Sequence, residues 1–217
     1  MLNRGMRWPL ILSLLLLSAC ARSERVTSHA DWMKEATRVW PGETRARVIA
    51  AAEAVLKQAD PRDTKFEYNQ RGFLAKRAFF IYAVIASAEG VDSWSFTTAE
   101  NSEGASASVR VIQRGKAIAG QHSERFRDNQ TMVGSFRLFW ARIDYMLGHR
   151  PDWVSCNEAA AKLDLPAAAP GLEGLCSLTH QGRGEPPPPK LDTTKVTPKA
   201  APKGPPAPPP LEAESET

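Results

Sequence analysis

Residues 73–87 of this 217-residue chain read FLAKRAFFIYAVIAS, and this stretch decides how the fold is interpreted. Aromatic and branched residues dominate it, and turn residues stand at both of its ends. After Ala78 both sets of alternate positions are apolar, which is typical of a strand that is covered on both faces. The length would also suit a helix, so that alternative stays open, but the residue types favour a strand.

Shorter segments of strand character flank this stretch. Residues 64–68 alternate polar and aromatic side chains, and residues 69–72 (NQRG) predict a hairpin connection into the long strand. Further along the chain, residues 93–98, 106–113 and 115–120 place small, branched or aromatic side chains at alternate positions. Together these segments predict an antiparallel meander of about four strands.

Two stretches have the periodicity of amphipathic helices. Residues 44–59 repeat apolar side chains at helical spacing, and residues 133–147 do so more strongly, with Val133, Phe136, Trp140, Ile143 and Leu147 three or four positions apart. Residues 31–40 predict a shorter helix, and the polar residues 121–129 are interpreted as a linker. The predicted fold class is α+β, with an N-terminal and a C-terminal amphipathic helix packed on one face of the meander.

The N-terminus has the features of a secretory signal. Arg4 and Arg7 precede an apolar run of eight residues, LILSLLLL, which is far shorter than the ~20 residues that a membrane-spanning helix needs. The run leads into Leu17-Ser18-Ala19-Cys20, which resembles the lipobox of bacterial lipoproteins. The resemblance covers this N-terminal segment alone, and the globular part is not matched to a family.

The lipobox resemblance implies a lipid anchor. In that family the signal, here residues 1–19, is removed and Cys20 carries the acyl chains, which hold a protein stably on a bilayer when there are two or more. The alternative is an ordinary signal peptide with Cys20 near the cleavage site. Ala21 and Arg22 stand where an aspartate signals inner-membrane retention in this family, which implies an outer-membrane location facing the periplasm. Residues 20–30 are polar and predict a tether between lipid and domain.

The other two cysteines, Cys156 and Cys176, predict one disulfide. They stand 20 residues apart in a loop-rich segment, and the envelope permits disulfides. A metal site or a reactive thiol is the alternative, but there is no C-x-x-C motif, and His180 is the only histidine nearby in the sequence. No metal or other cofactor is therefore predicted.

The C-terminal residues 181–217 contain 11 of the 17 prolines and no aromatic residue, which predicts a disordered tail after a globular domain at residues 31–180. Such a tail can be a spacer, a ligand for an envelope partner or the cell wall, or an extension without a partner. The formal charge of +4 falls when Arg4 and Arg7 are removed with the signal, which argues against a nucleic-acid partner.

The sequence contains no recognisable catalytic motif. The histidines fall outside the predicted elements, and the polar pairs that can be drawn, such as Glu67 with Arg77, are explained by surface pairing. Arg77 is expected at the solvent-facing start of the long strand. We therefore expect a non-enzymatic, lipid-anchored envelope protein that binds another protein or supports an envelope assembly. A carrier of a hydrophobic ligand is the alternative, and an enzyme is a third class.

Overall fold

A computed structural model describes residues 28–129, 133–165, 172, 174–176 and 186–192. The predicted signal peptide, Cys20, most of the predicted tether and most of the proline-rich tail lie outside the described residues. In the part of the chain that is described, no helix is long and apolar enough to span a membrane.

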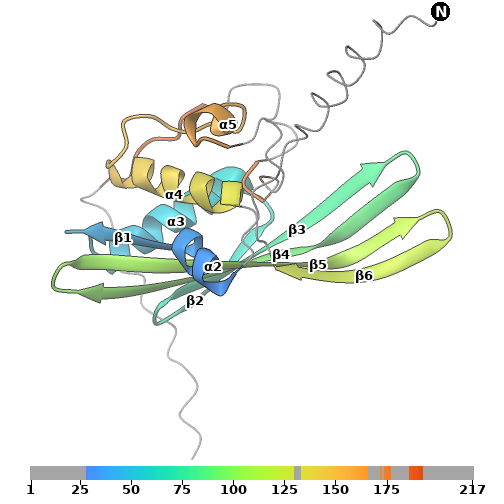
Figure 1. Cartoon of the computed structure of the whole chain (residues 1–217), viewed down its shortest axis with the longest axis horizontal. Helices are drawn as coiled ribbons and strands as arrows, with labels where there is room; N and C mark the ends of the chain where they lie inside the picture. Colours follow the sequence, from blue (N-terminus) through green and yellow to red (C-terminus); the bar gives the residue numbers. More distant parts are fainter. Residues whose placement is uncertain (1–27, 130–132, 166–171, 173, 177–185, 193–217) are drawn as a thin grey trace, which may run out of the picture.

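The chain alternates a few helices with long antiparallel strands (Figure 1). The elements in order are α2 (His29–Ala36), β1 (Thr37–Pro41), α3 (Arg45–Ala59), β2 (Thr64–Asn69), β3 (Gly72–Ala83), β4 (Ala86–Asn101), β5 (Gly104–Ala119), β6 (His122–Asn129), α4 (Val133–Leu147) and α5 (Ala159–Lys162).

All six strands belong to one antiparallel sheet, in the order β1-β5-β4-β3-β2, with β6 also paired to β5. Strand β1 pairs with residues 104–108 of β5 and β6 pairs with residues 112–119, so the two short strands share one edge of β5. The α+β class is therefore correct, but the prediction of about four strands is wrong.

The two additional strands come from segments that were expected to be a helix and a linker. Residues 37–41 form β1 instead of continuing the helix predicted over 31–40, and residues 122–129 form β6 instead of a linker. Residues 106–113 and 115–120 join into β5, whereas the stretch over 73–87 divides at Val84 and Ile85, which connect β3 to β4. Pairing with long neighbouring strands supplies the backbone hydrogen bonds that sequence periodicity alone did not indicate.

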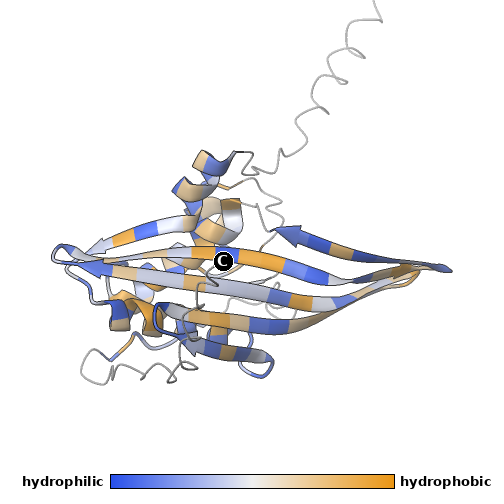
Figure 2. Cartoon of the chain, turned by 90° about the horizontal axis from the view of Figure 1, so that it is seen from below, coloured by the Kyte–Doolittle hydropathy of each residue, from blue (hydrophilic) through white to orange (hydrophobic). Residues whose placement is uncertain are grey.

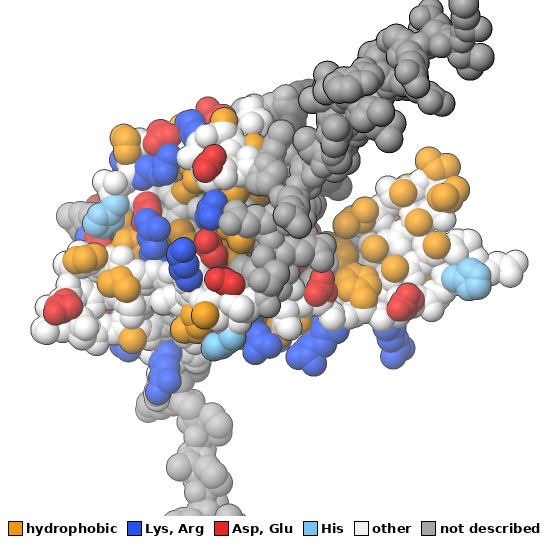
Figure 3. Space-filling model, in the orientation of Figure 1, with side chains coloured by type: hydrophobic (Ala, Val, Ile, Leu, Met, Phe, Trp, Pro, Cys, Tyr) orange, Lys and Arg blue, Asp and Glu red, His pale blue; other side chains and the backbone are white. Residues whose placement is uncertain are grey.

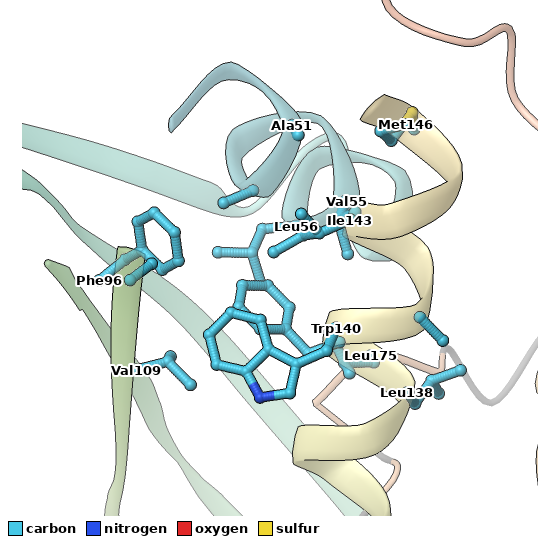
Figure 4. Packing of buried hydrophobic residues seen from close by; sticks show 14 of the residues in the cluster. Ala51, Val55, Leu56, Phe96, Val109, Leu138, Trp140, Ile143, Met146 and Leu175 are labelled. Carbon is cyan, nitrogen blue, oxygen red and sulfur yellow. The ribbon is translucent and has the colours of Figure 1, made fainter. Parts of the chain in front are cut away.

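The core lies between the sheet and helices α3 and α4, which cover one face of it (Figures 1 and 4). Phe139 and Trp140 of α4 pack on Trp94 and Phe96 of β4, with ring centroids 5.3 to 6.4 Å apart. Figure 4 shows Val55 and Leu56 of α3 and Trp140 and Ile143 of α4 gathered between the two helices and the strands that carry Phe96 and Val109. The helix boundaries at 45–59 and 133–147 agree with the periodicity. In α3 the buried residues form the apolar stripe of the sequence, whereas α4 is buried on nearly all sides, and the C-terminal loop contacts its Arg142.

A fully buried arginine fastens the C-terminal loop to α4. Arg142 is 0% exposed, donates hydrogen bonds to the carbonyl oxygens of Val154 and Leu175 at 3.1 and 2.9 Å, and lies 4.5 Å from the ring of Trp153. In the same loop Cys156 and Cys176 form a disulfide with a Cα–Cα distance of 5.9 Å, in agreement with the predicted pairing. The guanidinium therefore supplies hydrogen-bond donors to two backbone carbonyl groups of this loop.

The first prolines of the tail lie on α4. Tyr145 Oη donates a hydrogen bond to the carbonyl oxygen of Pro188 at 3.0 Å, and the Lys190 ammonium lies 5.0 Å from the Tyr145 ring. The Leu191 N–H donates to the carbonyl oxygen of Met146 at 3.3 Å, and the Leu191 side chain packs against the core. The described segment 186–192 is thus in contact with the globular domain.

Candidate functional site

The most distinctive feature of the surface is a part of the sheet that extends beyond the helices (Figures 1 and 2). We call it the β-wing and define it as residues 78–91 and 112–129, which form the β3–β4 and β5–β6 hairpins. The two hairpins pair through β4 and β5, so the β-wing is a four-stranded sheet. Helices α3 and α4 cover the other half of the sheet and leave the β-wing projecting into solvent.

The free end of the β3–β4 hairpin is apolar and exposed (Figure 3). The exposed fractions of its large side chains are as follows: Phe80 64%, Ile81 44%, Tyr82 73%, Val84 90% and Ile85 84%. Residues 78–88 contain no charged side chain at all. Single exposed apolar residues are ordinary on protein surfaces, but a contiguous group of this kind marks an interaction site.

The turn of this hairpin supports the same conclusion. Val84 and Ile85 form a two-residue connection, because Ala83 pairs directly with Ala86. Two-residue hairpin turns favour Asn and Gly, and the neighbouring β5–β6 hairpin has Gly120 in its turn, with φ +58°. Two β-branched, exposed residues are a poor choice for turn formation, so folding alone does not explain them.

An aligned row of residues holds the four strands of the β-wing together. The pairing places Phe79, Gly90, Gly115 and Phe126 side by side across β3, β4, β5 and β6. The two phenyl centroids lie 6.4 Å apart, and a Cβ on either glycine would lie within 2.8 Å of a ring carbon. The glycines are therefore required for the two rings to lie across the sheet, and the rings cover backbone that has no side chain of its own.

A row of buried polar residues lies where the β-wing joins the helix-covered half of the sheet. Arg77 Nη2 donates to Asp92 Oδ2 at 2.6 Å, Gln113 Nε2 donates to Asp92 Oδ1 at 2.9 Å, and Arg77 Nη1 donates to the carbonyl oxygen of Gly174 at 3.1 Å. Arg77 and Asp92 are only 9% and 4% exposed, so the expectation that Arg77 faces solvent is wrong. The cause is Asp92, directly opposite on β4, which supplies the counter-charge. Glu67 instead pairs with Lys76, at 2.6 Å.

The face of the β-wing turned away from the helices combines two surfaces. On β3 and β4 it is formed mainly by Phe80, Tyr82 and Val91, with one carboxylate, Glu89. On β5 and β6 it carries four exposed cations in two adjacent cross-strand pairs: Arg114 opposite Arg127, and Lys116 opposite Arg125. An apolar area beside a cationic area suits a partner surface that offers both apolar contacts and negative charge.

The other ionisable groups form structural contacts. His149 Nε2 lies 2.8 Å from Glu43 Oε1 and Arg47 Nη1 lies 2.7 Å from Glu43 Oε2, which joins the end of α4 to the start of α3. His29 and His122 lie in α2 and β6, apart from that cluster, and His180 lies outside the described residues. Among the residues that the structure describes, no group of His, Cys, Asp and Glu side chains is arranged to hold a metal ion.

The pKa shifts belong to the scaffold and not to the β-wing. Partial burial, with a hydrogen bond from the phenol to Glu53, raises the pKa of Tyr68 above its usual value. A hydrogen bond from Lys162 lowers the pKa of the partly exposed Asp152, and one from Ser155 lowers the pKa of the partly exposed Glu158. These shifts have local structural causes, so none of them by itself indicates a catalytic group.

Comparisons with models of protein families, with curated proteins and with solved structures found no match to this chain. The protein is of the α+β class, with a six-stranded antiparallel sheet, two main helices on one face of that sheet, and an apolar β-wing.

The sequence patterns did not predict the β-wing as a site. Its signals were an uncharged stretch over residues 78–88 and the isolated Phe126 in a polar segment. Both were interpreted in terms of folding, the first as a buried strand end and the second as linker.

Proposed function

We propose that this protein is a lipid-anchored component of a bacterial cell envelope that binds another protein through the β-wing and has no enzymatic activity. The observation that carries the proposal is the exposed apolar end of the β3–β4 hairpin, in which Tyr82, Val84 and Ile85 are each more than 70% exposed. Such a surface is costly in water and becomes favourable when a partner covers it.

The geometry supports a binding role more than the carrier role. A carrier encloses its ligand among apolar side chains. Here the exposed apolar side chains lie on an open hairpin end, while those beneath the helices pack against one another, as Phe96 does with Phe139 and Trp140. A flat strand surface suits a protein partner better than a small lipid.

The lipid anchor is proposed at Cys20, on the strength of the lipobox resemblance, with the outer membrane as the location. Replacement by Cys20→Ser should release the chain from the membrane fraction of its host cells, because two or more acyl chains provide the anchoring free energy. Continued sedimentation with membranes after this change would contradict the anchor, but it would leave the binding role of the β-wing untouched.

The binding role is tested by crosslinking in intact cells before lysis. The parent chain should yield a defined set of crosslinked products, and a Tyr82→Asp variant should lose them, because a charge on an exposed apolar contact opposes burial against a partner. Tyr82 is 73% exposed, so the variant should fold as stably as the parent.

Val39→Asp is the matched control, because Val39 is also an exposed apolar residue, 63% exposed, at the other end of the sheet. This control should retain the products. Equal loss from both variants, or no loss from Tyr82→Asp, would contradict the β-wing as the binding surface.

A further inference from the structure

The β-wing has two outer edges, and they differ in character. Strand β2 pairs with β3 only as far as Thr64 opposite Arg77, so no described strand pairs with the outer edge of residues 78–83. The opposite edge is β6, which pairs with β5 on one side only. Both edges therefore present backbone N–H and C=O groups that a further strand can bind.

The edge formed by β6 is protected against pairing, and the edge formed by β3 is not. Strand β6 has the sequence HSERFRDN, with four charged residues in eight, and charged side chains on an edge strand are the usual means of preventing edge-to-edge association. Residues 78–83 read AFFIYA and contain no charge, no proline and no glycine. The charged side chains of β6 thus oppose the addition of a further strand, and the edge formed by residues 78–83 has no such protection.

The backbone also argues against a lipid bilayer as the occupant. Apolar hairpin ends can enter membranes, but an open strand edge cannot lie in hydrocarbon with its N–H and C=O groups unpaired. An added β-strand satisfies those groups and covers Phe80 and Ile81 at the same time. The partner at this edge is therefore a strand.

We infer that the strand is β3 of a second copy of this chain, which deepens the proposed function and rests on it. The segment is self-complementary, because it is uncharged and apolar on both faces. Antiparallel pairing of two identical strands creates a two-fold axis perpendicular to the sheet, which is the commonest symmetry of homodimers. The β-wing carries this edge beyond the helices, so the two helical layers lie on opposite sides of the axis (Figure 1).

The register follows from the edge that is available. A two-fold axis perpendicular to the sheet keeps the same face of both copies on the same side of the joined sheet. Paired residues point to the same face, and side chains alternate along the strand, so the two residue numbers of each pair are both odd or both even and their sum is even. If the two-fold axis passed through the Phe80–Phe80 pair, Ala83 would lie opposite Arg77 of the second copy, where β2 of that copy already pairs. An axis through the Ile81–Ile81 pair avoids this conflict and lets all of residues 79–83 pair with the second copy.

In this register Ile81 of one copy lies opposite Ile81 of the other. Phe80 lies opposite Tyr82 of the second copy, on the face turned away from the helices, and aromatic cross-strand pairs of this kind stabilise antiparallel sheets. The joined sheet would continue through both molecules, with the charged β6 of each copy away from the junction.

The experiment is oxidative crosslinking of an Ile81→Cys variant of the full chain in intact cells, followed by non-reducing gels. Cα atoms opposite each other in antiparallel strands are ~4.5–5.5 Å apart, which is within the range of a disulfide. We expect a dimer that disappears on reduction. The parent chain controls for its own cysteines, and Gln121→Cys, at the exposed β5–β6 turn of the same β-wing, is expected to give severalfold less dimer.

A second variant shows whether strand pairing is responsible. Adding Phe80→Lys to Ile81→Cys introduces a charge at a 64% exposed position of the edge and should abolish the dimer without unfolding the chain. Equal dimer from the Ile81→Cys and Gln121→Cys variants would indicate random collision and would overturn the inference.

An Ile81→Cys variant that remains monomeric would also overturn it. If such a variant instead forms mixed disulfides with another protein, or a label at position 81 reports a lipid environment, the second copy is not the occupant. Loss of crosslinked products from Tyr82→Asp would still support the proposed function in that case, so the two failures are distinguishable.

Discussion

Replacement of Asp92 by asparagine tests whether the buried polar row fixes the β-wing to the domain. The change preserves size but removes the charge that faces Arg77 across β3 and β4, where the two groups are 2.6 Å apart. The side chains of Arg77 and Asp92 are 11% and 5% exposed, so solvent cannot replace the lost carboxylate.

The magnitude can be worked out in two ways. Breaking a buried ion pair by removing one partner costs about 3–5 kcal/mol. Two unit charges ~4 Å apart attract by roughly 4 kcal/mol at an effective dielectric constant of 20. Both routes predict that Asp92→Asn lowers the free energy of unfolding by about 3–5 kcal/mol.

The assay is urea denaturation followed by tryptophan fluorescence, with Trp94, two residues from the substitution, as a local reporter. Glu89→Gln is the matched control, because it also removes a carboxylate from β4 but at an exposed position, and it should change the free energy of unfolding by less than about 0.5 kcal/mol. Arg77→Met added to Asp92→Asn removes the unpaired charge and should recover stability. A loss below about 1 kcal/mol for Asp92→Asn, or no recovery in the double variant, would refute the reasoning.

Three further predictions concern the stability of the fold. Gly90→Val should destabilise the chain by about 1–3 kcal/mol in the same assay, because its Cβ would clash with the backbone oxygen of Arg114 and lie 2.7 Å from the Phe79 ring; an unchanged denaturation midpoint would contradict that packing. Reduction of the Cys156–Cys176 disulfide should cost about 3 kcal/mol, and a double Cys→Ser variant should match the reduced parent. Because the pKa of Tyr68 is raised in the folded state, stability should be complete below the usual tyrosine pKa of about 10 and fall as pH rises above it, and Tyr68→Phe should weaken that dependence.

The sequence predicted the helical part of the fold well. In α3 one stripe of the helix is buried, and a local pattern of three- and four-residue steps is sufficient to find it. The same steps located α4, but they did not indicate that its polar side, with Arg142, is also buried. The pairing of Cys156 with Cys176 was predicted from the number of cysteines and from the expected compartment, so it also needed no knowledge of the tertiary structure.

The β-wing could not be found in this way, because its strands do not have a buried face. Strand β6 is exposed at almost every position, so its sequence lacks the alternation that identifies strands. The connection between β3 and β4 has no turn residue, since Val84 and Ile85 stand there, and the end of β3 and the start of β4 were therefore predicted as one strand over residues 73–87. The burial of Arg77 depended on Asp92, 15 residues away, which only the strand register brings opposite it.

The central claim, that the apolar end of the β-wing is a protein-binding surface, is tested most directly by a photo-crosslinking amino acid placed at Tyr82 and activated in intact cells. The same amino acid at Val39 provides the comparison at another exposed strand position, away from the β-wing. The account predicts discrete protein adducts from position 82 and none, or far fewer, from position 39. An absence of adducts at position 82, or the same pattern from both positions, would contradict it.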